Sequence, residues 1–379
     1  MANNNDNKIL NVPPLRFPEF SGEWNTYKIA DILCIGNGRD YKHLSKGDIP
    51  VFGTGGYMIS VNECLYEGET TFIGRKGTIN KPFYYNGKFW TVDTLFYTHS
   101  FKRVIPKFVY CLFQTINWLR YNEASGVPSL SKDTIEKIKI RIPQLDEQKK
   151  IAKLLSLLDE RITTQNKIIE RYESLIRGIM VELQKQGLKR GTWKKVFLND
   201  ILKERNERNS NLYQVFSVSV SQGIINQVDH LGRSFSAKDT SKYNVVHYGD
   251  LVYTKSPTGS FPYGIVKQSL NHESVAVSPL YGVYVPDSLA IGIYLHKYFM
   301  SEINTQNYLH PLIQKGAKNT INITNQHFLE NRVPMPLDSN ELVLISKLLR
   351  SLNDKIRHEQ NMLQEYQKQK QYLLRQMFI

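Results

Sequence analysis

The segment IAKLLSLLDERITTQNKIIERYESLIRGIMVEL (151–183) decides the fold of this chain. Ten of its residues follow one another at alternating gaps of four and three, the spacing of a seam along one face of a long α-helix. Nine of the ten are apolar, so a helix standing alone would expose a continuous hydrophobic stripe. The pattern therefore predicts a helix that packs on a partner helix. Its seam residues are Ile151, Leu155, Leu158, Ile162, Gln165, Ile169, Tyr172, Ile176, Ile179 and Leu183.

The same pattern returns 194 residues later in the chain. ISKLLRSLNDKI (345–356) is identical to IAKLLSLLDERI (151–162) at six of twelve positions. Each pattern can form a helix of roughly 40 residues, about 60 Å long, and we expect the first to stop at Gly187. We predict that the two helices pack antiparallel as a spacer with one module at each end, and that polar seam residues fix their register. The second seam consists of Ile345, Leu349, Leu352, Ile356, Glu359, Leu363, Tyr366, Lys370, Leu373 and Met377.

Two copies of a larger module carry these helices. Gly22-Glu-Trp24 opens the first and Gly191-Thr-Trp193 the second, and short β-branched or aromatic runs broken by Gly, Pro and Asn follow in both. The predicted fold class is α+β, with two duplicated, mostly-β domains that carry packed helices and are separated by two long antiparallel, coiled-coil-like helices. The expected limits are 15–143 for the first domain, 144–187 for the central helix, 190–336 for the second domain and 337–379 for the C-terminal helix.

Length and charge narrow the class of function. At 379 residues the chain suits two domains, and a net charge of +14 with a pI near 9.4 favours a polyanionic partner such as nucleic acid. No run approaches the roughly 18 apolar residues of a spanning helix, and MANNNDNKIL (1–10) lacks the order of a signal peptide. We expect a cytoplasmic protein that does not engage a membrane.

No catalytic or metal-binding constellation appears in the sequence. Gly36-Asn-Gly38 is a lone GxG, no GxxxxGK[ST] phosphate loop exists, and none of the nine histidines forms HExxH. The three cysteines form no CxxC pair. These features favour a binding protein with no catalytic residues and no bound cofactor or metal.

Loops that combine cations, hydroxyls and glycines supply candidate DNA-binding residues. Gly74-Arg-Lys-Gly-Thr78 directly follows a strand pattern, and its glycines let the backbone approach a phosphate. Thr254-Lys-Ser-Pro-Thr-Gly-Ser260 has the same position in the second module. Lysines and hydroxyls position a protein on phosphates, whereas Arg, Asn and Gln read base edges. The predicted DNA-binding residues are Arg39, Lys42, Arg75, Lys76, Thr78, Lys81, Lys132, Lys255, Ser256, Thr258, Lys315, Lys318, Asn319 and Asn322.

Each module ends in an exit segment that leads into its long helix. The module exits, openings and strand-loop segments are IRIPQLDEQKKIAKLLSLLDERI (140–162), VPMPLDSNELVLISKLLRSLNDKI (333–356), GEWNTYKIADIL (22–33), GTWKKVFLNDIL (191–202), TTFIGRKGTINKP (70–82), FWTVDTLFY (89–97) and GDLVYTKSPTG (249–259). With these segments the chain resembles the DNA-specificity (S) subunit of type I restriction-modification enzymes. The resemblance covers the chain from about Leu15 to Ile379, and in the second exit Pro-Leu-Asp-Ser-Asn-Glu (336–341) lacks the Glu-Gln pair of the first.

The resemblance implies that each module reads one short half of a split, asymmetric sequence in double-stranded DNA, with the helices setting the gap. It implies two modification subunits that dock on this chain and methylate adenine with S-adenosylmethionine. Restriction subunits would add ATP- and Mg-dependent translocation and cleavage. The seam residues up to Tyr172 and Tyr366 would serve helix packing and subunit docking. The implied role is a non-catalytic specificity subunit in phage defence.

Two other interpretations make different predictions. A stand-alone DNA-binding regulator that homodimerises through its helices would bind DNA as a purified single chain. A self-contained methyltransferase or nuclease would need a cofactor motif, which the sequence lacks. An S subunit would instead depend on co-expressed modification subunits.

Overall fold

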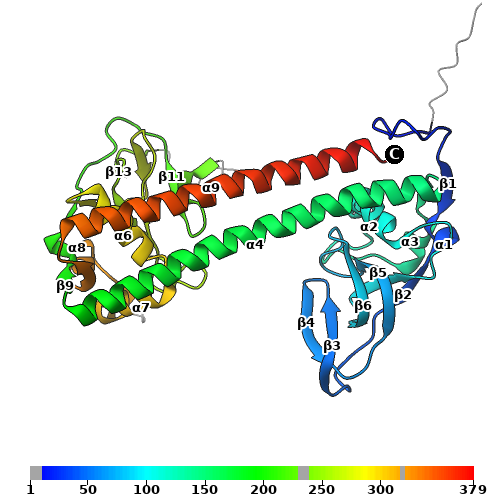
Figure 1. Ribbon diagram of the computed structural model, residues 1–379, viewed down its shortest axis with the longest axis horizontal. Coiled ribbons are helices and arrows are strands. Elements are labelled where there is room, and N and C mark those ends of the chain that lie inside the picture. The colour runs from blue at the N-terminus through cyan, green and yellow to red at the C-terminus, as the bar shows by residue number, and fades with distance from the viewer. Residues whose placement is uncertain (1–10, 229–238, 316–320) are drawn as a thin grey trace, which may run out of the picture. The chain divides into compact units, whose positions relative to one another are not determined.

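The computed structural model describes residues 11–228, 239–315 and 321–379 (Figure 1). The chain divides into two compact units: unit 1 is Met1–Asn166 with Asn361–Ile379, and unit 2 is Lys167–Gln360. Both predicted long helices form, as α4 (Leu145–Arg190) and α9 (Ser339–Gln376). Each unit therefore holds a module together with part of both helices, and the two cuts fall at positions related by the 194-residue repeat.

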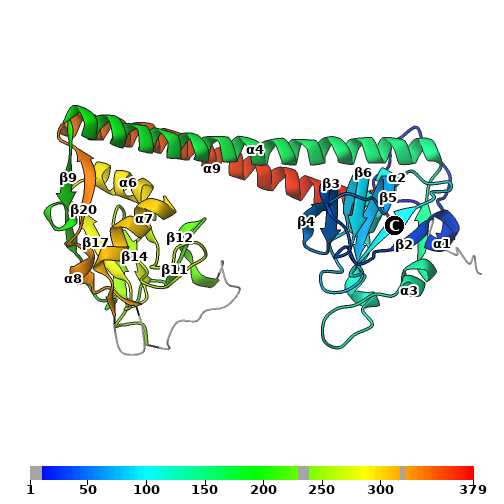
Figure 2. The same cartoon turned by 90° about the horizontal axis from the view of Figure 1, so that it is seen from below.

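Unit 1 is built on a six-stranded sheet with the strand order β2-β7-β5-β6-β3-β4 (Figure 2). All its strand pairs are antiparallel except β3 with β6. Helix α2 begins with Pro106, a residue well suited to the first turn of a helix. The elements are β1 (Asn25–Lys28), α1 (Ile29–Ile32), β2 (Cys34–Asn37), β3 (Lys46–Gly53), β4 (Gly56–Val61), β5 (Tyr66–Gly74), β6 (Phe83–Thr91), β7 (Leu95–His99), α2 (Pro106–Thr115), η1 (Trp118–Tyr121), α3 (Lys132–Lys137) and β8 (Lys139–Ile142).

Unit 2 repeats four of these six strands, counted from the β2 edge of the sheet. Its four-stranded sheet has the order β10-β17-β14-β15, which matches β2-β7-β5-β6 strand for strand along the chain. The strands outside that common part differ between the units. The elements are β9 (Trp193–Phe197), η2 (Leu198–Asp200), β10 (Leu202–Glu204), β11 (Phe216–Ser219), β12 (Gly223–Asn226), β13 (Asn244–Val246), β14 (Leu251–Tyr253), β15 (Val266–Gln268), β16 (Val275–Val277), β17 (Gly282–Pro286), α6 (Leu289–Tyr298), α7 (Glu302–Leu309), η3 (His310–Leu312), β18 (Gln314–Lys315), β19 (Ile321–Asn322), α8 (Asn325–Phe328) and β20 (Arg332–Pro336).

Each module is closed at its base in the same way. The opening strand pairs antiparallel with the exit strand, β1 with β8 in unit 1 and β9 with β20 in unit 2. The opening tryptophan then reaches the first turn of the helix that follows the module: Trp24 Nε1 donates to Glu147, and Trp193 Nε1 donates to Glu341 over 2.8 Å. The duplication seen in the sequence is therefore a duplication of packing.

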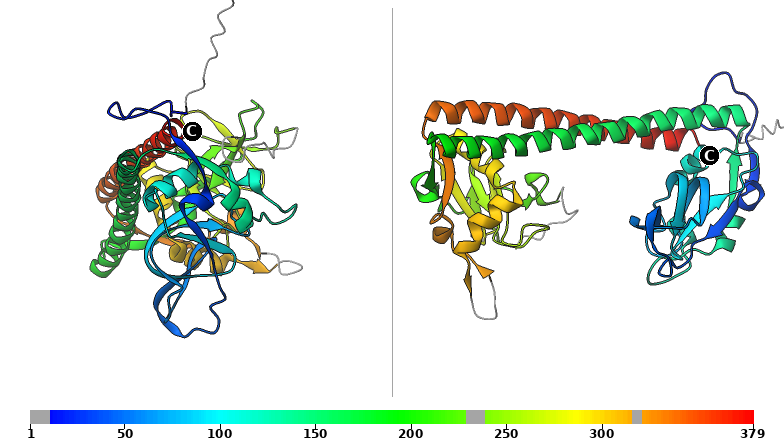
Figure 3. Two further views of the ribbon diagram at one scale, coloured as in Figure 1. Left: turned by 90° about the vertical axis from the view of Figure 1, so that its right-hand side faces the viewer. Right: turned by 60° about the horizontal axis from the view of Figure 1, so that its bottom comes forward.

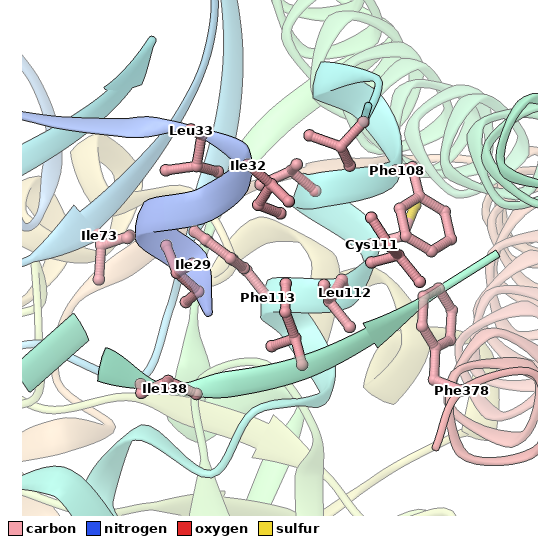
Figure 4. Packing of buried hydrophobic residues seen from close by; sticks show 14 of the residues in the cluster. Ile29, Ile32, Leu33, Ile73, Phe108, Cys111, Leu112, Phe113, Ile138 and Phe378 are labelled. Atoms are coloured by element: carbon pink, nitrogen blue, oxygen red, sulfur yellow. The ribbon is translucent and has the colours of Figure 1, made fainter. Parts of the chain in front are cut away.

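A single hydrophobic cluster joins the helices of unit 1 to its sheet (Figure 4). Phe108, Leu112 and Phe113 of α2 are buried in it, together with Ile73 of β5. Phe378, just beyond α9, packs against the rings of Trp24 and Phe108 with centroid distances of 6.1 and 5.4 Å. The end of α9 is thereby part of the same core as the start of the chain's first module.

The seam residues of both long helices lie on covered faces. None of the twenty is exposed, whereas Leu157, Leu175, Val181, Leu344 and Leu348 on the other faces are 44–66% exposed. Within unit 1 the halves of α4 and α9 run antiparallel side by side, since Arg161 lies over the ring of Tyr366 and Asp159 pairs with Lys370 further along (Figure 3).

One position of the 194-residue repeat binds the ammonium group of a lysine in each unit. Asp159 Oδ1 lies 2.5 Å from Lys370 Nζ, which also sits over the ring of Tyr110 in α2. In unit 2 the counterpart of Asp159 is Asn353, whose Oδ1 accepts from Lys297 Nζ of α6 over 2.7 Å. Lys370, one of the two polar residues in the second seam, therefore makes an ion pair that fastens the two helices to each other.

Helix α4 does not stop at Gly187. It continues to Arg190, and Gly191 adopts the left-handed conformation that ends it, with φ at +73°. The glycine at position 187 is explained by packing, because a Cβ there would lie 2.1 Å from Cδ1 of Trp193. The glycine therefore marks the contact of the helix with the opening tryptophan of unit 2.

Two glycines of α4 give a matched test of this packing. Gly178 is exposed with nothing within 4 Å of its Cβ position, so Gly178→Ala should stabilise the chain by about 0.5–1 kcal/mol through helix propensity alone. Gly187→Ala should destabilise it by about 1–3 kcal/mol because Trp193 must move. Urea unfolding followed by circular dichroism measures both, and changes of the same sign would contradict the assigned contact.

Candidate nucleic-acid interface

In unit 1 the turn Thr91–Thr94 between β6 and β7 gathers three loops through main-chain hydrogen bonds. The Thr91 carbonyl accepts from Arg39 N over 2.8 Å, and the Thr94 carbonyl accepts from Arg75 N and Lys76 N over 2.8 and 3.2 Å. Val92 N donates to the carbonyl of Phe52, next to the tip of the β3–β4 hairpin, over 3.0 Å. Loops that are far apart in the sequence thus meet at the ends of β3, β5 and β6.

Glycine is required where these loops turn. A Cβ at Gly74 would lie 2.1 Å from the Thr78 carbonyl oxygen, and one at Gly38 would lie 1.9 Å from that of Val92. The Gly36-Asn-Gly38 pair, which lacks the rest of a nucleotide motif, is therefore explained by close packing of the Arg39 loop. The turn after β5 leaves Arg75 and Lys76 exposed.

The two cations of this turn are held differently. The Arg75 guanidinium lies 5.8 Å from the Phe96 ring centroid, and its Nη1 donates to the Asp93 carbonyl over 3.3 Å. Lys76 forms no ion pair with any described residue. The Arg75 guanidinium is held in place by these contacts and is suited to a DNA contact of fixed geometry. The Lys76 ammonium has no ion-pair partner among the described residues and is suited to bind a phosphate.

A further loop, residues 122–131, packs on this turn and contains no predicted site residue. Gly77 N donates to the Pro128 carbonyl, and Leu130 N donates to that of Arg75, both over 2.8 Å. Residues 122–131 include neither lysine nor arginine, so the pattern of cations in the sequence does not predict this loop. The run Ser-Gly-Val-Pro-Ser (125–129) is the feature of the sequence that indicates this loop, because its composition is typical of an exposed turn.

The remaining predicted residues of unit 1 are less uniform. Lys42, Thr78 and Lys81 are exposed in loops. Lys132 instead begins α3 and lies 3.6 Å from Glu136, so its charge is already paired within one helix. The structure therefore gathers Arg39, Arg75 and Lys76 around one turn and sets Lys132 apart.

In unit 2 the loop after β14 holds the predicted residues in a tighter arrangement. Lys255 has a left-handed backbone with φ at +61°, which is uncommon for a side chain of this size. The space for it comes from Gly264, whose Cβ position lies 2.8 Å from Lys255 N. Burial lowers the pKa of Lys255, and the carboxylate of Glu204 acts in the opposite direction. The lysine is half-buried, unlike Arg75 and Lys76.

The other candidates of unit 2 surround this loop only in part. Ser256 is exposed, while Thr258 is half-buried and exchanges main-chain hydrogen bonds with Phe261. Lys318 and Asn319 lie outside the described residues. Lys315 belongs to β18 and Asn322 to β19, two short strands that pair with each other. Their DNA contacts stay predictions.

No group of three or more His, Cys, Asp or Glu side chains among the described residues could hold a metal ion. Nor does any described helix combine the length and apolar character needed to cross a membrane.

Comparisons with known proteins agree with this arrangement. Residues 21–173 match the family model described as "Type I restriction modification DNA specificity domain". The type I restriction enzyme MjaVIII specificity subunit of Methanocaldococcus jannaschii is 33% identical over 138 residues, which are 34% of this chain and 30% of that protein. The putative type I specificity subunit S.MpnORF201P of Mycoplasma pneumoniae is 23% identical over 192 residues, 48% of this chain and 76% of that protein.

One solved structure resembles the chain over nearly its full length. The crystal structure of a type-I restriction-modification system S subunit from M. genitalium has a TM-score of 0.68 and covers 97% of this chain and 99% of its own. At 12% sequence identity this likeness establishes a shared fold. Together with the family match over residues 21–173, it confirms the resemblance of this chain to the DNA specificity subunits of type I restriction-modification enzymes that the sequence indicates.

Proposed function

We propose that the chain recognises a split, asymmetric DNA target, with unit 1 reading one half and unit 2 the other. The observation that carries this proposal is the shared strand order β2-β7-β5-β6 and β10-β17-β14-β15, which presents two different loops from the same place. The loop after β5 has two exposed cations, and the loop after β14 has one half-buried lysine. Two modules with the same strand order but different loops are suited to recognise two half-sites of different sequence.

The long helices would set the gap between the half-sites. Half-sites approached from one side of a duplex lie about 34–36 Å apart, one helical turn. A helix rises about 1.5 Å per residue, so helices of 46 and 38 residues can span that distance. Because each unit contains parts of both helices, neither module can shift along the pair without breaking its own core.

The chain itself would carry no active site and would act as a scaffold. Two modification subunits would supply adenine methylation with S-adenosylmethionine, and restriction subunits would supply the chemistry that uses ATP and Mg²⁺. The seam residues are covered within each unit, so docking would use the outer faces, where Leu157, Leu344 and Leu348 are exposed. Covered seams also remove the need for a homodimer, which favours this role over a stand-alone regulator.

Methylation mapping tests the proposal. The chain would be co-expressed with the modification subunit of its host, and methylated adenines mapped across the genome by single-molecule sequencing. We expect one split motif with a fixed gap, lost when this chain is deleted. A soluble complex without new methylation would contradict the proposal.

The turn after β5 of unit 1, which carries Arg75 and Lys76, is named the cationic turn. It gives a mutational prediction. Arg75→Ala with Lys76→Ala should weaken DNA binding and lower the slope of log affinity against log salt by about 2, because each lost phosphate contact removes about 0.9. Lys28→Ala with Lys139→Ala is the matched control: these exposed lysines are paired across β1 and β8 and remove the same charge. Equal effects of the two double variants on the salt slope would remove the turn from the interface.

The spacer role predicts a change in gap length. A heptad inserted in α4 after Asn166 together with one in α9 after Gln360 keeps both seams in phase and adds about 10 Å, or about three base pairs of DNA. The mapped motif should widen by that amount. A heptad in α4 alone should abolish assembly, since the seam of α9 would no longer match. An unchanged gap in the double insertion would rule out the spacer role.

A further inference from the structure

The β3–β4 hairpin of unit 1 exposes three large apolar side chains in succession. Tyr57, Met58 and Ile59 are 62%, 50% and 44% exposed, although they belong to a strand of the main sheet. An edge strand normally buries alternate side chains, and β4 is the edge strand of its sheet. Only Val61, at the end of this strand, is buried with Val51 and Trp90. The base of the hairpin is thus fixed, and its outer part faces solvent on both sides.

The tip of this hairpin adjoins the cationic turn. Thr54 Oγ1 is the nearest atom to the Cβ position of Gly77, at 3.8 Å. The Phe52 carbonyl accepts from Val92 N in the turn Thr91–Thr94, and the main chain of Arg75 and Lys76 is hydrogen-bonded to the same turn. A register shift between Val51 and Phe52 marks a bulge, which redirects the strand beyond it. The apolar side chains and the two cations therefore belong to one continuous surface.

The chemistry of the hairpin complements that of the turn. IPVFGTGGYMIS (49–60) contains no charged residue, so it offers no contact that phosphates would favour. Gly55 and Gly56 at the tip have nothing within 4 Å of their Cβ positions, which makes the tip narrow and open. The major groove admits a two-stranded β-ribbon, and apolar side chains there contact the methyl group of thymine. An unpaired apolar edge also risks self-association, a cost that a binding role would explain.

We propose that the β3–β4 hairpin is the base-reading element of unit 1 and enters the major groove of the duplex that Arg75 and Lys76 hold by its phosphates. Tyr57 and Met58 contact thymine methyl groups in one half-site. The hairpin sets specificity for thymine, and the cationic turn sets affinity. This inference rests on the proposed function, because it requires a DNA target with two halves.

Deoxyuridine substitution tests the proposal atom by atom. Once the methylated motif is mapped, the assembled complex is titrated with duplexes in which one thymine at a time is replaced by deoxyuridine, which removes a methyl group and leaves base pairing intact. We expect at least one position in one half-site to lose affinity about four-fold, the value for burying one methyl group. A half-site series without any sensitive position would overturn the proposal.

Two alanine variants then assign the contact to the hairpin. Tyr57→Ala or Met58→Ala should abolish the effect of deoxyuridine at the sensitive position while leaving sensitivity in the other half-site unchanged. Leu119→Ala is the matched control, since Leu119 is 54% exposed elsewhere in unit 1. Retained sensitivity in both hairpin variants would overturn the proposal, as would a concentration-dependent dimer of the chain that Tyr57→Ala dissolves. If no motif is methylated at all, the proposed function fails first and the hairpin assignment with it.

Discussion

A tryptophan at the start of each module donates its indole N–H to a glutamate in the first turn of the helix that follows the module, and much of the structure depends on this contact. In unit 1 the accepting residue, Glu147, is 2% exposed and also binds the Arg16 guanidinium through both carboxylate oxygens, at 2.8 and 2.7 Å. Removing one member of such a buried pair typically costs about 3–5 kcal/mol. The contact ties the beginning of a module to the helix at its end, so a mostly-β module and a long helix become one body. Glu341 repeats the contact with Trp193 at the 194-residue offset.

This closure separates the part of each module that is fixed from the part that varies. The opening strand, the exit strand and the tryptophan are fastened together in both units, and both units share the same order of four strands. The loops after β5 and β14 carry none of this packing, so they differ in charge, burial and backbone conformation. Gln148 shows how the difference extends to the exits. Its amide is buried and bonded to the main chain at Arg103, Ile105 and Pro143, whereas its counterpart in unit 2 is the apolar Leu342. The Glu-Gln pair at the first exit thus fastens the module from within.

The two long helices could be predicted because their apolar residues recur at alternating gaps of four and three, and a helix face with that spacing must pack on a partner. Local rules failed where tertiary packing gives the same residue another purpose. Gly187 has the form of a helix stop, yet it is there because Trp193 leaves no room for a Cβ. Cations alone could not locate the interface, because the loop at residues 122–131 has none and Lys132 is paired with Glu136. The exposure of Met58 depends on β4 being an edge strand, and the burial of Lys255 on the close approach of Gly264; both are set by contacts that the local sequence does not show.

The most direct test of this account is to exchange one module at its closing strands and map the methylated sequence. Residues 25–142, from the first residue of β1 to the last of β8, would be replaced by the matching module of a family member whose split target has been mapped. Trp24, Glu147 and both long helices would be kept. The account predicts that one half of the target changes to that of the donor, while the other half and the gap stay as they were. A chimera that assembles and methylates DNA but changes both halves, or changes the gap, would contradict it.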